Sequence, residues 1–351
     1  MKINFEKNPP RTLRELEFFA KKKSQKGTFD WLNAGAEFGR TMKINEDAFK
    51  NVEIIPNLFN DTSNLDTSTS FFGHKLSMPI VISPMGHQTQ FHKNGEAELA
   101  EGTKSESILL SFSTQGRMTL KQIKKKFPEG KFIWDFFPFG PRKWIKEQIL
   151  DAKKNGAVGI ALTIDAPVRS VRYLDREARY DARKHGKFFK SMPPDISYAR
   201  KLKSEDLKWM KEYCGKLPFL IKGILSSNDA NIAVKNGADV VWVSNHGGRM
   251  LESCYSSLKA LVAIKKDIKE NTTFFFDSGV RSGSDIIKAF GLGANVVGIG
   301  RPAIYGLILA GKKGVKHMLT LVREELESAM INSSVSKIKD IQRQNIIKYN
   351  P

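Results

Sequence analysis

Residues 240–249 are VVWVSNHGGR, an apolar run that passes directly into a polar turn. The run VVWV has the apolar, β-branched composition of a strand that is buried on both faces, as in a parallel sheet. The two glycines at positions 247 and 248 permit a tight turn behind it. The stretch therefore predicts a buried strand whose carboxyl end carries His246 and Arg249.

Seven further runs have the same composition: PIVIS (79–83), ILLSF (108–112), KFIWD (131–135), GIALTID (159–165), PFLIKG (218–223), TFFFDSG (273–279) and NVVGIG (295–300). Segments of helical periodicity separate most of them, and several end in Gly or Asn, as helices do. Eight alternating strands match the number that closes a barrel, and the G-x-G-x-x-G turn of an open nucleotide-binding sheet does not occur. We therefore predict an α/β fold, a (β/α)8 TIM barrel in a single domain over residues 1–351.

Three segments extend this predicted barrel. Residues 1–70 contain a helical pattern at Arg11–Lys22 and form an N-terminal helical extension that is expected to cap one end. A long polar connection follows the fourth strand, and because such insertions usually lie over the active face, residues 170–210 are a candidate active-site lid. Residues 315–330, VKHMLTLVREELESAM, have the pattern of an amphipathic helix.

The chain has 57 basic and 37 acidic residues and a net charge of +20. That excess suits nucleic acid, an anionic membrane or an anionic substrate, but the lysines are scattered through helical segments, so we expect solvated faces and no nucleic-acid partner. Cys214 and Cys254 lack the spacing of a metal site or a disulfide scaffold, so we expect no metal and a cytoplasmic location. No segment approaches the roughly 18 apolar residues of a transmembrane helix.

The carboxyl ends of barrel strands usually carry the functional residues. The loops after the seventh and eighth strands contain Gly279 with Arg281 and Gly300 with Arg301. Glycine amides, a helix N-terminus and arginine side chains in these loops are typical of a phosphate site. Lys222 ends the fifth strand inside an apolar run, where burial requires an anionic partner. His246 lies where a general base is expected.

An ordered series of motifs spans nearly the whole chain: FDWLNAGAE, GHKLSMPIVISPM, FHKNGE, LTIDAPV, IKGI, WVSNHGGR, FDSGVRSG and GIGRP. In this series the chain resembles the FMN-dependent 2-hydroxy acid oxidases and dehydrogenases, the group of glycolate oxidase and lactate oxidase. The resemblance implies FMN as cofactor, a small-molecule hydroxy acid as substrate, oxygen or another electron acceptor, and a homotetramer.

The resemblance also implies a role for each matching residue. His246 is the expected base, Asp165 positions it and stabilises its protonated form, and Arg249 and Arg172 hold the substrate carboxylate. Lys222 would stabilise negative charge at N1 and O2 of the flavin. The other expected FMN contacts are Pro84, Met85 and Gly86 beside the ring, Ser111, Thr163 and Ser244 as hydroxyl groups, and Asp277, Gly279, Arg281, Gly300 and Arg301 around the ribityl phosphate.

Five positions depart from the family pattern. Two of them, His87 and Gln88, stand where the family usually has small or apolar residues. Trp31 and Phe137 stand where the family has substrate-binding tyrosines, so two phenolic hydroxyls are absent and the substrate-binding surface is aromatic and apolar. Asp135 stands where the family has a glutamine near the N3 and O4 edge of the flavin. A carboxylate there can accept from N3–H but repels O4 when ionised.

We predict an enzyme that oxidises a 2-hydroxy acid to a 2-oxo acid, with a hydride or carbanion equivalent passing to the flavin. Trp31 and Phe137 favour an alternative on the same scaffold, in which the substrate is a larger or aromatic hydroxy acid or a modified peptide. A second alternative is a flavin-binding protein without turnover. It predicts bound FMN that no acid reduces.

Overall fold

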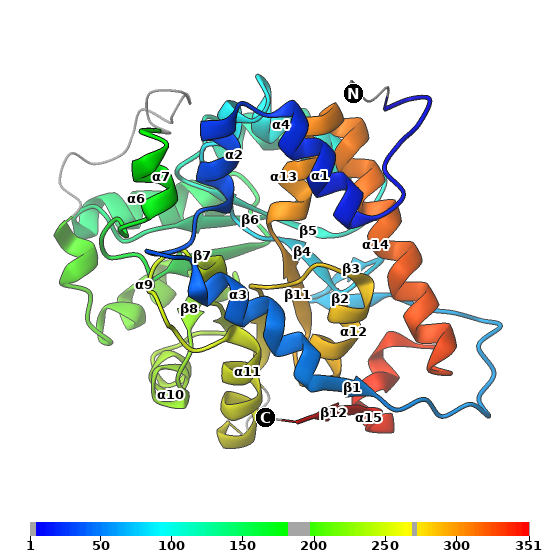
Figure 1. Cartoon of the computed structure of the whole chain (residues 1–351). Coiled ribbons are helices and arrows are strands. Elements are labelled where there is room, and N and C mark those ends of the chain that lie inside the picture. Colours follow the sequence, from blue (N-terminus) through cyan, green and yellow to red (C-terminus); the bar gives the residue numbers. More distant parts are fainter. Residues whose placement is uncertain (1–4, 182–196, 269–271, 351) are drawn as a thin grey trace.

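The computed structural model describes residues 5–181, 197–268 and 272–350. Eight parallel strands close a barrel in the order β10-β11-β4-β5-β6-β7-β8-β9 (Figure 1). Their bounds are β4 (Ile80–Ile82), β5 (Leu109–Ser113), β6 (Lys131–Phe136), β7 (Gly159–Thr163), β8 (Phe219–Ile224), β9 (Val240–Val243), β10 (Thr273–Phe276) and β11 (Val296–Ile299). Each falls within one of the eight predicted runs or extends it by a single residue, which confirms the predicted (β/α)8 barrel.

The strands are continuously apolar because both of their faces are covered. One set of side chains fills the barrel and includes Leu109, Leu220 and Trp242, whereas a larger set packs beneath the surrounding helices. A hairpin of β2 (Thr69–Phe71) and β3 (His74–Leu76) adds Phe71 to the interior set, with its ring centroid 5.2 Å from that of Phe275. The interior is therefore a packed core.

A helix follows each strand: α4 (Gly95–Thr103), α5 (Leu120–Lys126), α6 (Arg142–Lys154), α9 (Asp206–Cys214), α10 (Ser227–Lys235), α11 (Ser257–Asp267), α12 (Gly283–Gly291) and α13 (Arg301–Ala310). Side-chain caps define several starts; Thr119, for example, forms a capping box with Gln122. Helix α14 (Lys312–Asn332) contains the predicted amphipathic segment and packs on α13 and α4. Among the described residues, none of the helices has the length and apolar character needed to cross a membrane.

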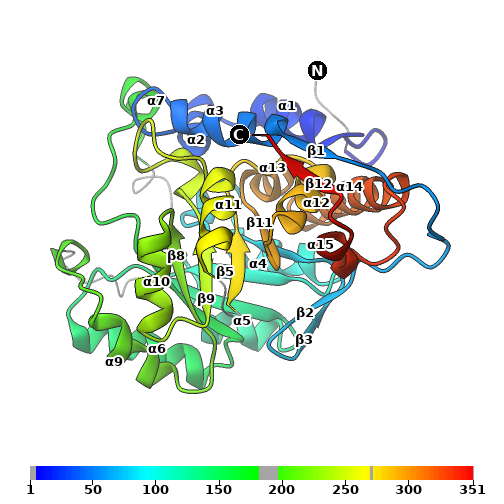
Figure 2. The same cartoon turned by 90° about the horizontal axis from the view of Figure 1, so that it is seen from below.

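The N-terminal extension forms α1 (Leu13–Lys23), α2 (Lys26–Asn33), α3 (Arg40–Asp47), η1 (Ala48–Asn51) and β1 (Val52–Ile54). The residues between α2 and α3 bind loops at the carboxyl ends of the strands, because Ala36 N–H donates to Gly248 O and Glu37 N–H donates to Val171 O. This part of the extension therefore covers the carboxyl end of the barrel. Strand β1 pairs with β12 (Ile347–Tyr349), which lies close to the C-terminus, and the pair packs beside α12 (Figure 2).

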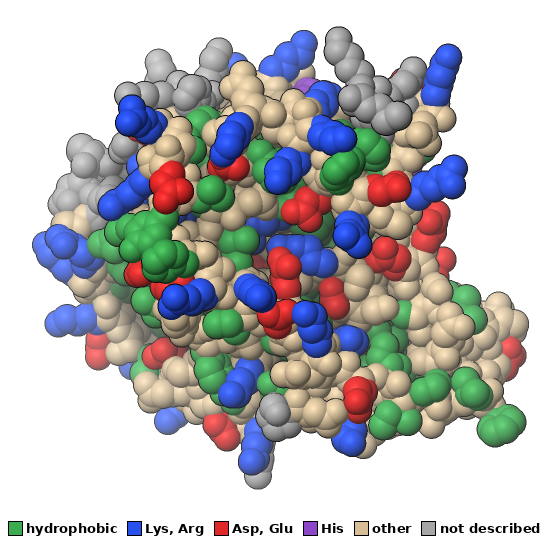
Figure 3. All heavy atoms as spheres, in the orientation of Figure 1, with side chains coloured by type: hydrophobic (Ala, Val, Ile, Leu, Met, Phe, Trp, Pro, Cys, Tyr) green, Lys and Arg blue, Asp and Glu red, His purple; other side chains and the backbone are tan. Residues whose placement is uncertain are grey.

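The predicted lid, residues 170–210, contains α7 (Tyr173–Glu177), η3 (Ser197–Arg200) and the start of α9. Residues 182–196 of this segment lie outside the described residues. The first part of this segment contacts the N-terminal extension, since Arg172 pairs with Glu37 in an isolated β-bridge. The sequence predicted that the basic residues are scattered over solvated faces. On the face shown in Figure 3, lysines and arginines lie spread among acidic and apolar side chains.

Candidate functional site

A cavity of about 650 Å³ lies at the carboxyl ends of the barrel strands, beneath the N-terminal extension. This volume is within the range of small-molecule and cofactor sites. Fourteen of the predicted site residues line the cavity: Trp31, Pro84, Met85, Gly86, Phe137, Arg172, Lys222, His246, Arg249, Asp277, Gly279, Arg281, Gly300 and Arg301. Residues from both ends of the sequence thus meet in one place.

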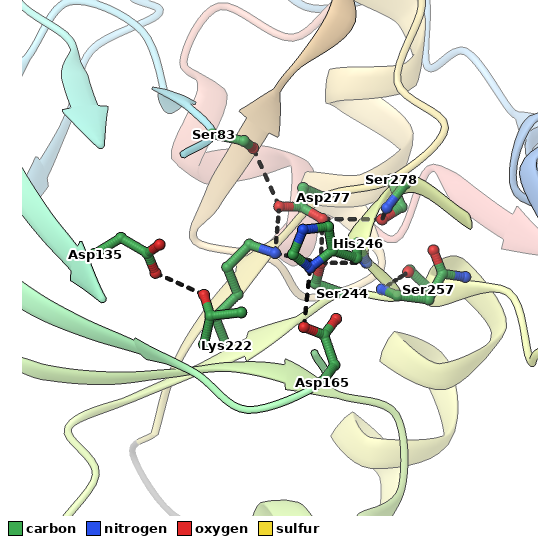
Figure 4. Close-up of polar contacts among 12 residues, drawn as sticks. Ser83, Asp135, Asp165, Lys222, Ser244, His246, Ser257, Asp277 and Ser278 are labelled. Atoms are coloured by element: carbon green, nitrogen blue, oxygen red, sulfur yellow. Dashed lines mark hydrogen bonds and ion pairs between the residues drawn. The ribbon is translucent and has the colours of Figure 1, made fainter. Parts of the chain in front are cut away.

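The pair of His246 and Asp165 lies at one side of this cavity. His246 Nδ1 is 3.0 Å from Asp165 Oδ1 (Figure 4). Burial by itself raises the pKa of Asp165, but the charge and hydrogen bond of His246, together with the charge of Lys222 and a backbone hydrogen bond, outweigh burial, and the net pKa is lowered. Asp165 is therefore a carboxylate that can orient the imidazole and stabilise its protonated form.

A glycine makes room for this carboxylate. Gly223 has φ +106°, and a Cβ there would lie 2.6 Å from both Cβ and Cγ of Asp165. The register of β8 against β9 is irregular at this point, between Lys222 and Ile224. A side chain at position 223 would displace Asp165, so the motif IKGI contributes to the geometry of the His246–Asp165 pair.

His246 itself has a left-handed backbone, with φ 60°. Such a conformation is uncommon outside glycine and persists where the surroundings determine it. Its N–H donates to Ser244 Oγ at 3.1 Å, and the next N–H, of Gly247, donates to Ser278 Oγ at 3.0 Å. Asn245 exchanges side-chain amide bonds of 2.7 and 2.8 Å with Asn45 of α3. The extension therefore helps to hold the turn that carries His246.

Lys222 and Asp277 form a buried polar group below the cavity. Lys222 Nζ donates to Ser244 Oγ at 2.9 Å and lies 3.7 Å from Asp277 Oδ2 (Figure 4). Asp277 also accepts from Ser244 at 2.5 Å and from Ser83 at 3.1 Å. Burial lowers the pKa of Lys222, but the nearby carboxylates of Asp277, Asp165 and Asp135 outweigh it and raise the pKa. Lys222 is consequently a cation that faces the cavity.

Four predicted cofactor contacts, Ser111, Asp135, Thr163 and Ser244, are buried directly behind the residues that line the cavity. Thr163 Oγ1 donates to Asp135 Oδ1 at 2.6 Å, and burial raises the pKa of Asp135 to about 7. Ser111 Oγ is buried without a hydrogen-bond partner in the described part of the chain. These residues form a polar layer between the barrel core and the cavity.

Arg249 is held by the extension. Its Nη1 donates to the carbonyls of Trp31, Leu32 and Ala34 at 2.9–3.0 Å, and its guanidinium lies 4.9 Å from the Trp31 ring centroid. Burial and the neighbouring cations Arg172 and Arg301 lower the pKa of Arg249 well below its usual value. An anion in the cavity would relieve this repulsion.

Arg172 faces the same aromatic ring, 5.8 Å from its centroid. Its Nε and Nη2 both lie 2.7 Å from Asp175 Oδ2, one turn along α7. The sequence analysis did not assign Asp175, although the i,i+3 spacing is a signal that could have identified it. Asp175 fixes the guanidinium and neutralises part of its charge.

The cavity also contains the residues of the predicted phosphate site. Arg301 begins α13, which has no side-chain cap, and Arg301 donates to Leu32 O and Gly247 O at 3.1 Å. Burial and Arg281 lower the pKa of Arg301 to about 10. At Gly300 a Cβ would meet only Met85 Sδ, 3.7 Å away, so the cavity reaches the start of the helix. The uncapped helix start and the buried Arg301 guanidinium favour an anion here.

The remaining wall of the cavity is mostly aromatic. Phe137 stacks on Phe139 with ring centroids 4.9 Å apart, and Trp31 meets the edge of His87 at 5.4 Å. His87 Nε2 lies 3.2 Å from Gln115 Oε1, and burial lowers the pKa of His87 to about 4. The sequence analysis noted His87 as a departure from the family pattern without giving it a role, and it did not assign Gln115 or Phe139, because no local pattern links loops that meet only in the folded barrel.

No cluster of three or more His, Cys, Asp or Glu side chains that could hold a metal ion occurs among the described residues. The cavity combines an imidazole–carboxylate pair, several cations and an aromatic wall. These are features of a site for an anionic organic substrate and a phosphate-bearing cofactor.

Comparison with known proteins identifies the family. The family model for FMN-dependent dehydrogenase matches residues 20–348. Glycolate oxidase 1 of Zea mays is 31% identical over 350 residues, which cover 95% of this chain and 94% of that protein. The 2-hydroxyacid oxidase of Dictyostelium discoideum is 31% identical over 354 residues, with 95% and 89% covered.

A solved structure extends the match to three dimensions. A soluble mutant of the membrane-associated (S)-mandelate dehydrogenase from Pseudomonas putida superimposes with a TM-score of 0.88 at 26% identity, covering 97% of this chain and 99% of that one. Family model, relatives and structure agree over nearly the whole chain. The chain therefore belongs to the FMN-dependent dehydrogenase family and is an FMN-dependent oxidoreductase of the 2-hydroxy acid oxidase and dehydrogenase type.

Proposed function

We propose that this enzyme oxidises a 2-hydroxy acid to the 2-oxo acid, with His246 as the base that removes the hydroxyl proton. The observation that carries the proposal is the 3.0 Å contact between His246 Nδ1 and Asp165 Oδ1 beside a cavity that also contains Arg249. A base whose second nitrogen is held by a carboxylate can take a proton with its free edge. A cation in the same cavity can hold the acid.

The residues of the cavity fit FMN. The buried Ser111 hydroxyl has no protein partner in the described part of the chain, and Lys222 supplies a buried cation. Gly300 and Arg301 provide an open, cationic helix start for the phosphate. FMN, when bound, accepts the two electrons that leave the substrate carbon.

The chain's own groups divide the remaining work. Asp165 stabilises the imidazolium of His246 after proton transfer. Arg249 and Arg172 orient the carboxylate, and because three carbonyls fix the Nη1 group of Arg249, its remaining N–H groups are already positioned. The buried position of these groups strengthens each interaction relative to water.

The aromatic wall favours a 2-hydroxy acid with a large apolar or aromatic side chain. Trp31, Phe137 and Phe139 surround the cavity near His246, with the Phe137 ring centroid 6.1 Å from that of the imidazole. Small acids would lose the hydroxyl donors that tyrosines supply at two of these positions. A hydroxy acid at the end of a modified peptide is a second candidate, which the same aromatic wall favours.

A substrate panel tests these assignments. We would record the visible spectrum of the purified holoenzyme and add glycolate, lactate, larger aliphatic hydroxy acids and mandelate without oxygen, following flavin bleaching. Bleaching that is fastest with mandelate and absent in His246→Ala, with FMN still bound, is the expected result. Rapid bleaching by glycolate or lactate alone would refute the preference for a large side chain, and undiminished bleaching in His246→Ala would refute the role of the base.

Two further assignments belong to the proposal. We infer a cytoplasmic location, supported by the two free cysteines, and a homotetramer, which the resemblance to the family implies. Light scattering of the eluted holoenzyme tests the second. Oxygen uptake during turnover, compared with reduction of an artificial dye, identifies the electron acceptor as oxygen or another molecule.

A further inference from the structure

Three carboxyl groups and one lysine share the buried layer below the cavity. Lys222 lies 3.7 Å from Asp277, and Asp165 lies 3.0 Å from His246. The third carboxyl, Asp135, is 1% exposed, and the hydrogen bond from the Thr163 hydroxyl is the one contact described for its side chain. One ammonium group therefore serves three carboxyls, and the one without an ionic contact is Asp135.

The position of Asp135 in the sheet explains this isolation. It lies near the end of β6, between Ser113 of β5 and Ala161 of β7, neither of which carries charge. Lys222, on β8, directs its ammonium to Ser244 and Asp277 and away from Asp135 (Figure 4). A charge on Asp135 would thus be buried without direct neutralisation, which is costly.

We propose that Asp135 exchanges a proton with solvent near neutral pH as the charge on FMN changes, so that uptake of this proton compensates negative charge on the reduced cofactor. The proposal rests on the FMN site described above. During reduction, two electrons and one proton enter the flavin. Where Asp135 is ionised in the oxidised enzyme, reduction of the flavin causes the carboxyl to take up one proton from solvent. This proton compensates the negative charge that the flavin gains.

The surrounding groups account for the direction of this exchange. Burial raises the pKa of Asp135 to about 7, the Thr163 hydroxyl and Lys222 oppose that rise, and Asp165 and Asp277 add to it. These groups come from β7, β8 and the loops after β7 and β10. Additional negative charge in the cavity acts in the same sense as Asp165 and Asp277, so it raises the pKa further. The resulting uptake of a proton favours the reduced cofactor.

Reduction potentials measured without substrate test the proposal. The holoenzyme is equilibrated with a reference dye and reduced chemically at intervals between about pH 5 and pH 9. We expect the reduction potential of the wild type to fall more steeply with pH around and above neutral pH than below it. The slope should increase by about 30 mV per pH unit, because this is the value for one extra proton taken up per two electrons. In Asp135→Asn, which cannot ionise, the extra slope should be absent. Parallel lines for the two proteins would overturn the proposal.

A second variant and a second measurement test the proposal independently, in case Asp135→Asn does not fold. Removing the hydroxyl hydrogen bond in Thr163→Val should shift the steeper region to higher pH, since that bond favours the ionised form. Infrared spectra of the wild type should contain a protonated carboxyl band that disappears as the pH passes neutrality. An unshifted profile in Thr163→Val, or the absence of the titrating band, would also overturn the proposal. Because chemical reductant replaces the hydroxy acid, failure of the proposed substrate assignment would leave these results unaffected.

Discussion

Replacing Asp165 with Asn should slow flavin reduction far more than it weakens substrate binding. The variant keeps the shape of the side chain but removes the charge 3.0 Å from His246 Nδ1. A hydrogen bond to a charged group contributes roughly 1.5 to 3 kcal/mol, and each 1.36 kcal/mol is a factor of about ten in rate. If this bond operates only when the imidazole is protonated, the limiting rate should fall roughly 10- to 150-fold.

A larger loss is expected if the new amide group rotates. Its NH₂ would then donate to Nδ1, and His246 would carry its proton on the other nitrogen, which is the wrong tautomer for a base. The Oδ2 oxygen of Asp165 is buried and has no hydrogen-bond partner among the described residues, so no neighbour there holds the amide in the productive orientation.

Anaerobic stopped-flow reduction with the best acid of the panel measures this effect, because it separates the limiting rate from the dissociation constant. Asp175→Asn is the matched control, since it makes the same change beside Arg172 at 2.7 Å and does not contact His246. We expect Asp175→Asn to change the dissociation constant and Asp165→Asn the limiting rate. A wild-type limiting rate in Asp165→Asn would refute the role of the carboxylate.

Four other predictions follow from particular contacts. Gly223→Ala should lower the limiting rate of flavin reduction in the same way as Asp165→Asn and lower the melting temperature, because its Cβ would lie 2.6 Å from Asp165. Phe137→Tyr restores a phenolic hydroxyl, and the KM for lactate should fall roughly 5- to 150-fold in steady-state assays, as expected for about 1 to 3 kcal/mol. Arg301→Met should weaken FMN binding, measured by fluorescence titration of the apoprotein, by a similar factor. The raised pKa of Asp135 means that the folded state binds more protons than the unfolded state between about pH 4 and pH 7. The free energy of unfolding of the wild type, measured in urea, should therefore fall relative to that of Asp135→Asn by up to about 1.4 kcal/mol per pH unit as the pH rises through this window. Above about pH 7 the difference between the two proteins should not change further.

The architecture followed from patterns that are local in the chain. A strand buried on both faces must be apolar along its whole length, so each of the eight strands was recognisable from a few consecutive residues. The polar residues that interrupt these runs, such as Lys222, His246 and Asp277, were recognisable for the same reason. Parallel closure then places all strand ends at one face, and the site residues come together.

The partners of those residues were not recognisable from local patterns. Arg249 is held by carbonyls of residues 31–34, more than two hundred positions away, and nothing in either segment specifies that contact. The pairing of His87 with Gln115 likewise joins two separate loops. Such contacts depend on how the extension packs against the barrel.

The sequence by itself therefore determined the fold and the positions of the candidate reacting groups, because hydrophobic periodicity and strand-end chemistry are written in neighbouring residues. The cofactor followed from the resemblance of the ordered motifs to a known family. Only the tertiary structure decided that Asp165 is ionised while Asp135 has a pKa of about 7. Both are buried aspartates at strand ends, and they differ because one contacts an imidazole and the other a neutral hydroxyl. Burial and the charge of the nearest neighbour set the pKa of a carboxyl, and both are properties of the folded chain.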